Sequence, residues 1–230
     1  MSETSQADNR ITSIARHIDK NAIVADIGTD HAYLIAYLLT SGKINKAYAC
    51  DINKLPLENA RETLEKYDLT NMVELVLTDG LNGLNISEID EFVIAGMGGK
   101  TIISILDSCK KNLTDKKFIL QPMTKFEHLR EYLITNGFEI LCEDPVVSGK
   151  FVYTLIVCKK TGINQNKSPD YKYLGEIINS PLPEKERYLK RIYINIKRRL
   201  EGLMKTTGHE EEKAIYRAVI EKIEKHWGEI

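Results

Sequence analysis

Over its first 160 residues the chain alternates short apolar, β-branched runs with longer amphipathic segments. The short runs are typical of buried strands, and the longer segments have the apolar spacing of helices. This alternation predicts a parallel sheet with crossover helices, and right-handed crossovers make the sheet doubly wound. The expected strands cover residues 22–27, 46–52, 73–78, 92–95 and 117–120, and the expected helices cover residues 32–41, 55–67, 101–111 and 126–136.

The alternation stops near residue 137. Two strand-like runs, 138–147 and 151–159, are separated only by Ser148-Gly149-Lys150. A link this short joins antiparallel strands, because a parallel connection needs a long crossover. We therefore expect an α/β, Rossmann-like sheet that closes with a terminal antiparallel strand. A class I methyltransferase sheet has this ending, and a plain dinucleotide-binding fold does not predict it.

The last third of the chain has a different pattern. Residues 161–169 are polar and contain Gly and Pro, which is typical of a linker. Beyond them the apolar residues follow helical spacing in two stripes, with Gly208 between as a turn. The stripes are Leu189, Ile192, Ile196 and Leu203, then Ile215, Val219, Ile223 and Trp227. They predict a coiled-coil-like antiparallel helical hairpin. We expect two domains, 1–160 and 165–230.

The net charge of −1 by itself points to no class of binding partner. Lys and Arg number 14 against 11 acids in residues 161–230, so the tail is mildly basic. No pair of the four cysteines has CxxC spacing, so we expect neither a metal site nor a redox pair. The polar start is not typical of a signal peptide, and no apolar run suits a membrane span. We expect a cytoplasmic protein, and no feature calls for an obligate protein partner.

The most informative segment is the turn after the first expected strand. Asp26 ends the strand, Gly28 allows positive φ or a close ligand approach, and Asp30 follows. This is the first βα turn of a nucleotide-binding sheet, but the usual GxGxxG is missing. A pyrophosphate would meet the Asp30 carboxylate, whereas a phosphate-free cation would be attracted to it. On this ground S-adenosylmethionine fits better than NAD.

Acids and glycines also end the later strands. Asp51 ends the second, where a carboxylate can accept from ribose hydroxyls, and Asp79-Gly80 ends the third, where it can accept from an adenine amino group. Residues 95–99, AGMGG, end the fourth and suit close approach to a ligand. Each feature alone is also typical of a cap or tight turn. Their recurrence at successive strand ends favours a nucleotide site.

Four motifs together resemble one family. ADIGTDHAYL (25–34), IAGMGGKTI (94–102), LQP (120–122) and GKFVY (149–153) resemble the bacterial TrmK family, and the resemblance extends over nearly the whole chain. Its members are tRNA methyltransferases that modify N1 of adenine 22 in the D-arm. The resemblance implies S-adenosylmethionine as cofactor, tRNA as partner, LQP beside the base and a tRNA-holding tail. It also implies a cofactor site lined by Asp26, Gly28, Asp30, His31, Asp51, Asp79, Gly80 and Gly96.

Two positions depart from the family pattern. Ile35 stands where a proline often follows, which is a mild difference at a helix start. Met123 stands where an asparagine often follows Gln-Pro. The second departure puts a catalytic role for position 123 in doubt, because that asparagine would be a polar group near the base.

N1 of adenine carries an in-plane lone pair, so it can attack a sulfonium methyl without a strong general base. The enzyme must chiefly align the atoms, exclude water and offer acceptors to the adenine amino group. We expect Gln121 and the backbone around Gly96 and Met97 to supply those acceptors. N1 lies on the pairing edge, so the base must be unpaired or flipped out. Tyr33 and Met97 are candidates to stack on it, or are core residues.

Residues 187–199 hold six cations and no acid, a pattern that suits phosphate contact. The alternative is an ordinary solvated helix face. We expect tRNA contact through the cations of this segment and through the N-terminal helix, namely Arg187, Lys190, Arg191, Lys197, Arg198 and Arg10.

Three other functions stay open at this point. A small-molecule methyltransferase would share the cofactor site but leave the basic tail without a purpose. A non-catalytic RNA-binding module of the same fold would not need its three strand-end aspartates. An NAD oxidoreductase is the least favoured, because the glycines are missing and the terminal hairpin is present.

Overall fold

A seven-stranded sheet forms the centre of the molecule. The computed structural model describes residues 9–228, and its strand order is β3-β2-β1-β4-β5-β7-β6. The strands are β1 (Val24–Ile27), β2 (Ala47–Asp51), β3 (Val73–Leu77), β4 (Glu91–Gly98), β5 (Lys117–Thr124), β6 (Phe138–Ser148) and β7 (Phe151–Lys160). Neighbours among β1–β5 pair in parallel, and β7 is antiparallel to both β5 and β6. The predicted α/β sheet with an antiparallel last strand is confirmed. The antiparallel strand β7 lies second from the edge of the sheet, between β5 and β6.

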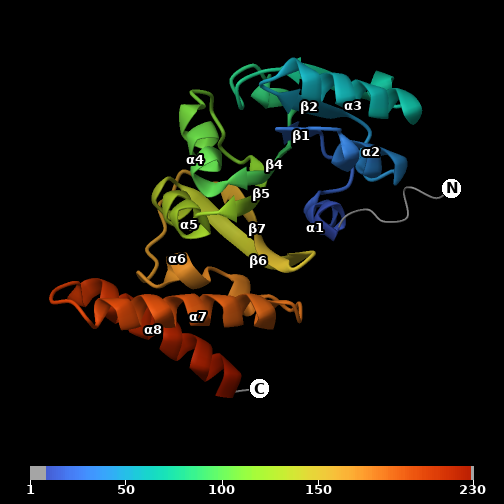
Figure 1. Cartoon of the computed structure of the whole chain (residues 1–230). Coiled ribbons are helices and arrows are strands. Elements are labelled where there is room, and N and C mark those ends of the chain that lie inside the picture. The colour runs from blue at the N-terminus through green and yellow to red at the C-terminus, as the bar shows by residue number, and fades with distance from the viewer. Residues whose placement is uncertain (1–8, 229–230) are drawn as a thin grey trace.

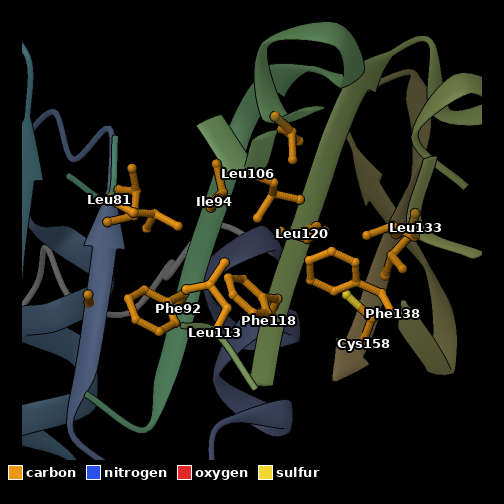
Figure 2. Close-up of a cluster of buried hydrophobic side chains, with 14 of the residues drawn as sticks. Leu81, Phe92, Ile94, Leu106, Leu113, Phe118, Leu120, Leu133, Phe138 and Cys158 are labelled. Atoms are coloured by element: carbon orange, nitrogen blue, oxygen red, sulfur yellow. The ribbon is translucent and has the colours of Figure 1, made fainter. Parts of the chain in front are cut away.

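Helices cover both faces of the sheet (Figure 1). One face packs on α1 (Asn9–His17), α2 (Tyr33–Thr40) and α3 (Lys54–Lys66), and the other on α4 (Gly99–Ser108) and α5 (Phe126–Thr135). Successive strand residues enter opposite cores, because side chains alternate across a sheet. Phe92 and Ile94 thus belong to one core and Val93 to the other. Phe92, Phe118 and Phe138 form a row across β4, β5 and β6 in the first core, with adjacent centroids 5.2 and 5.5 Å apart (Figure 2).

The chain after β7 forms short turns and then two long helices. Two small elements, α6 (Tyr171–Leu174) and η4 (Ile177–Asn179), precede α7 (Lys185–Leu203) and α8 (Glu210–Gly228). The remaining short helices are η2 (Thr70–Met72) and η3 (Ile86–Glu88). α8 returns along α7 after a turn at Gly208, whose φ is +86° (Figure 1). The two apolar stripes meet in a third core, which also contains Val152 of β7. The tail is therefore packed on the sheet, and the boundaries 1–160 and 165–230 stay predictions.

A buried ion pair fixes the tail to the sheet. Arg130 of α5 and Glu143 of β6 have fully buried side chains, with Nη2 and Oε2 2.7 Å apart. Arg130 also donates to the carbonyls of Lys172 and Tyr173 and to the Tyr188 hydroxyl; Glu143 also accepts from Thr154 Oγ1 and from Glu176 N–H. This network satisfies both charges, so they tolerate burial. Gly175, with φ +54°, lies against it: a Cβ there would sit 2.1 Å from Glu143 Oε1.

Candidate functional site at the carboxyl ends of the central strands

The turn after β1 is held by the neighbouring strand. The N–H groups of Gly28 and Thr29 both donate to the Cys50 carbonyl, at 2.8 and 2.9 Å. Gly28 has a φ of +81°, which favours glycine. Thr29 is buried, and its hydroxyl accepts from the N–H of Ala32, the residue before α2, at 3.2 Å. These bonds fix the path of the chain from the strand end into the helix.

Asp26 and Asp51 lie close enough to repel each other. Burial raises the pKa of the Asp26 carboxyl to about 6; a hydrogen bond from Thr29 opposes this, and the charge of Asp51 adds to it. One oxygen of Asp51 accepts from Asn53 N–H at 2.8 Å, which orients that carboxylate at the end of β2. The strand ends therefore hold two carboxylates in surroundings that a cation would stabilise.

Asp30, His31 and Tyr33 form a surface group beside the turn. His31 Nε2 lies 3.4 Å from Asp30 Oδ2, and the His31 ring stacks on Tyr33 with centroids 5.1 Å apart. Tyr33 is 57% exposed, so it is not a core residue. Its exposed ring remains a candidate to stack on a base.

The third strand end is tied to the second. Thr78 N–H donates to the Asp51 carbonyl at 2.9 Å, which places the following Asp79 beside the end of β2. Asp79 is exposed, and Gly80 is buried with a φ of +59°. A Cβ at Gly80 would lie 3.1 Å from the Ile105 side chain, so this glycine also serves helix packing.

The fourth strand end contains a bulge that the sequence did not predict. The β4–β5 register shifts between Ala95 and Met97, so Gly96 falls outside the regular ladder. Its N–H donates instead to Gln121 Oε1 at 3.0 Å, and Gly96 has a φ of +75°. Gln121 is 1% exposed, and its Nε2 donates to Met123 Sδ at 3.4 Å. Both ends of the Gln121 amide are thus engaged within the protein.

This geometry gives Gln121 and Met123 a structural role. Gln121 Oε1 accepts from the Gly96 N–H of the bulge, so Gln121 holds the bulge in place. Met123, the departure from the family pattern, supplies a weak sulfur acceptor to the Gln121 amide. Gly96 itself is exposed, and a Cβ built on it meets nothing within 4 Å, so space is open there.

Met97 joins the first and fourth strand ends. A Cβ placed on Gly28 would lie 2.0 Å from Met97 Cε, so the Met97 side chain reaches over the glycine turn. Gly99 lies against the other neighbour, where a Cβ would be 2.5 Å from the Lys125 carbonyl oxygen. The ends of β1, β4 and β5 are therefore packed together.

The predicted RNA-binding cations lie mostly on α7. Arg187 donates to the Lys150 carbonyl of the β6–β7 turn at 2.6 Å, and Arg191 lies over the Tyr188 and Phe126 rings at 5.0 and 5.8 Å. Lys197 lies 5.5 Å from the Tyr193 ring centroid, and Lys190 and Arg198 are exposed. Arg10 is partly buried on α1, which packs against α2, β6 and β7.

A family model described as a methyltransferase domain matches residues 7–156. The chain belongs to this methyltransferase family.

The resemblance to TrmK is also confirmed. The tRNA (adenine(22)-N(1))-methyltransferase of Bacillus subtilis (strain 168) is 37% identical over 135 residues, or 58% of this chain and 57% of that protein. The alignment thus spans just over half the length of that relative.

Two solved structures match at greater length. The B. subtilis M1A22 tRNA methyltransferase TrmK has a TM-score of 0.77 at 25% identity, covering 96% of this chain and 97% of that one. M. capricolum TrmK, in complex with S-adenosyl-homocysteine, has a TM-score of 0.73 at 27% identity, covering 94% and 96%.

Two further features concern the whole described chain. Between residues 9 and 228 there is no group of three or more His, Cys, Asp or Glu side chains arranged to hold a metal ion. None of the helices in that range is both long and apolar enough to cross a membrane.

Sequence reasoning missed Thr29, which fixes the turn and bonds Asp26. A threonine directly after the turn glycine was the available signal. It also missed the hydrogen bond from the Gly96 N–H to Gln121, because nothing in the sequence shows that this N–H has left the strand ladder. The contact of Gln121 with the base stays a prediction.

Proposed function

We propose that this protein transfers a methyl group from S-adenosylmethionine to N1 of an adenine in tRNA. Position 22 of the D-arm is the proposed target, because the B. subtilis relative carries that position in its name. The observation that carries the proposal is the pair of carboxylates, Asp26 and Asp51, beside the Gly28 turn. We assign residues 1–160 to catalysis and residues 165–230 to tRNA binding, in the cytoplasm.

The strand ends suit this cofactor. Asp26 lies in an environment that disfavours its own charge, and the Asp51 carboxylate adds to the cost. A ligand that carries positive charge and no phosphate relieves that cost, whereas a pyrophosphate increases it. We assign Asp51, at the end of β2, to accept from the ribose of the cofactor. When bound, S-adenosylmethionine supplies a methyl group on a positively charged sulfur.

The chain's own residues have a positioning task in this reaction. N1 of adenine needs no prior deprotonation, so no general base is required. Gln121 holds the Gly96 bulge, and the bulge sets where the Met97 side chain and the open space at the end of β4 lie. We assign Tyr33 and Met97 to base contact, and Gln121 to keeping the bulge in place.

The exposed side of α7 suits an RNA backbone. Lys190 and Arg198 flank Ile194 at four-residue intervals, so the three share one face. Ile194 is 55% exposed, and Arg187 and Arg191 lie on the adjoining turns. Cations that neutralise phosphates give salt-dependent affinity, and a central apolar side chain can contact a sugar or base.

The test is incubation of the protein with labelled S-adenosylmethionine and unmodified tRNA, followed by nucleoside mass spectrometry. We expect 1-methyladenosine in tRNA with adenine at position 22, and none in a matched tRNA with guanine there. Methylation of small molecules but not of tRNA would reject the tRNA assignment. Absence of cofactor binding by calorimetry would reject the enzyme assignment and favour a non-catalytic module.

A further inference from the structure

Three side chains outside the methyl-transfer site form a line from sulfur to carboxylate. Cys142 Sγ lies 3.9 Å from His17 Nδ1, and the other ring nitrogen of His17 lies 2.8 Å from Asp144 Oδ2. The second oxygen of Asp144 accepts from Ser180 Oγ at 2.8 Å. The group joins α1, β6 and the segment after η4, so it is assembled by the tertiary fold.

A bulge in β6 creates this arrangement. The β6–β7 register shifts between Ile140 and Cys142, which leaves Leu141 as the extra residue. Beyond the shift, Cys142 and Asp144 are two residues apart and share a strand face, and His17 of α1 contacts both. Glu143, between them, points to the opposite face and meets Arg130.

The order of groups is that of an activated nucleophile: a thiol, a base beside it and a carboxylate that orients the base. Hydrogen bonds to Asp144 and Cys142 raise the pKa of His17 to about 9, so the ring is cationic near neutral pH. Arg16 is a further positive charge that acts on Asp144. A cation next to sulfur favours the reactive thiolate.

We propose that Cys142, with His17 and Asp144, is a reactive thiol site that forms mixed disulfides with low-molecular-weight disulfides. The Cys142 thiolate attacks one sulfur of the reagent and forms a new S–S bond, while the reagent's own S–S bond breaks. The departing thiolate takes the proton of the His17 imidazolium and leaves as a thiol. Asp144 holds the ring in the orientation that both steps need.

The other cysteines provide internal references. Cys50 and Cys158 are fully buried, and burial raises the pKa of each thiol. Cys109, at the end of α4, is partly exposed as Cys142 is. The comparison between Cys109 and Cys142 therefore isolates the effect of the His17–Asp144 pair from the effect of exposure.

The experiment treats the native protein with glutathione disulfide and follows each cysteine by peptide mass spectrometry. At about pH 7 we expect Cys142 to react about tenfold faster than Cys109 or more. Equal rates for the two cysteines at about pH 7 would overturn the proposal.

Variants separate activation from mere exposure. His17→Gln should lower the Cys142 rate about tenfold. His128→Gln, which removes an exposed histidine of α5, should leave that rate unchanged. An unchanged rate in His17→Gln would also overturn the proposal. If circular dichroism shows that His17→Gln is not folded, Asp144→Asn and the wild-type comparison with Cys109 decide the matter.

Discussion

Asp26→Asn should stabilise the unliganded protein while it weakens cofactor binding. The native pKa of Asp26 is about 6, against a reference value of 3.8. Because the native carboxyl is protonated more readily than the unfolded one, its ionisation reduces stability above about pH 6. This loss of stability decreases as the pH falls from about 6 to 3.8, below which the carboxyl is protonated in both the native and the unfolded protein.

The pKa shift of Asp26 determines how much unfolding free energy the substitution can add. A shift of one pKa unit corresponds to about 1.4 kcal/mol, so two units correspond to about 3 kcal/mol for a fully buried group. Asp26 is only partly buried, and the amide must still be accommodated, so we expect about 1–2 kcal/mol of added unfolding free energy at about pH 7.5. Urea unfolding followed by circular dichroism measures it. The difference should shrink as the pH approaches about 4.

The same substitution removes the charge that attracts the cofactor. Calorimetric titration should give an affinity for S-adenosylmethionine at least about tenfold weaker for Asp26→Asn at about pH 7.5. Wild-type affinity should fall below about pH 6, and the variant's affinity should not. Asp107→Asn, at an exposed aspartate of α4, should change neither quantity appreciably. A destabilised Asp26→Asn with intact cofactor affinity would refute the electrostatic argument.

Three other perturbations test separate parts of the structure. Gln121→Ala removes the acceptor of the Gly96 N–H, so kcat should fall about tenfold while cofactor affinity changes less than about threefold. Gln121→Glu should retain more activity because it keeps an acceptor. Equal kcat for Gln121→Ala and wild type would remove the bulge from the mechanism. Glu143→Gln leaves a buried guanidinium without its counter-charge and should lower the unfolding free energy by about 3 kcal/mol in urea titrations; a loss below about 0.5 kcal/mol would contradict this account of the tail attachment. The double variant Arg191→Glu, Arg198→Glu should weaken tRNA binding in filter-binding assays and reduce the slope of log affinity against log salt concentration by about two. Charge reversal at an exposed lysine on α3 should change neither quantity. Unaltered affinity of the double variant would exclude α7 as the docking surface.

Periodicity predicted the alternation of strands and crossover helices from β1 to α5, because the short and the longer apolar segments differ in spacing. The expected hairpin at residues 138–159 is confirmed as β6 and β7. The sequence did not show that β4 and β5 run past the bulge to Gly98 and Thr124, because a glycine at residue 96 suggested the end of the strand. Whether such a glycine ends a strand or bulges from it depends on the partner strand, which a single sequence does not display.

In the candidate site, too, the sequence predicts some features and not others. Asp26 and Asp51 could be placed, because the ends of parallel strands share one edge of a sheet. The role of Gln121 could not, since it depends on a hydrogen-bond donor 25 residues away. The Arg130–Glu143 pair was not predicted either. Arg130 follows Leu129 on a buried face of α5, and a charge in such a place is accounted for only when its partner is known.

The attachment of the tail bears on how RNA binding and methyl transfer are coordinated. β5 carries Gln121 near its end, Lys125 follows it against Gly99, and Arg130 lies little more than one helical turn further on. Arg130 in turn binds backbone carbonyls of the tail. The tail is therefore connected to the bulge through one short segment, residues 121–130, whose two ends are buried. On the proposed function, Glu143→Gln should lower turnover on tRNA more than it lowers affinity for S-adenosylmethionine.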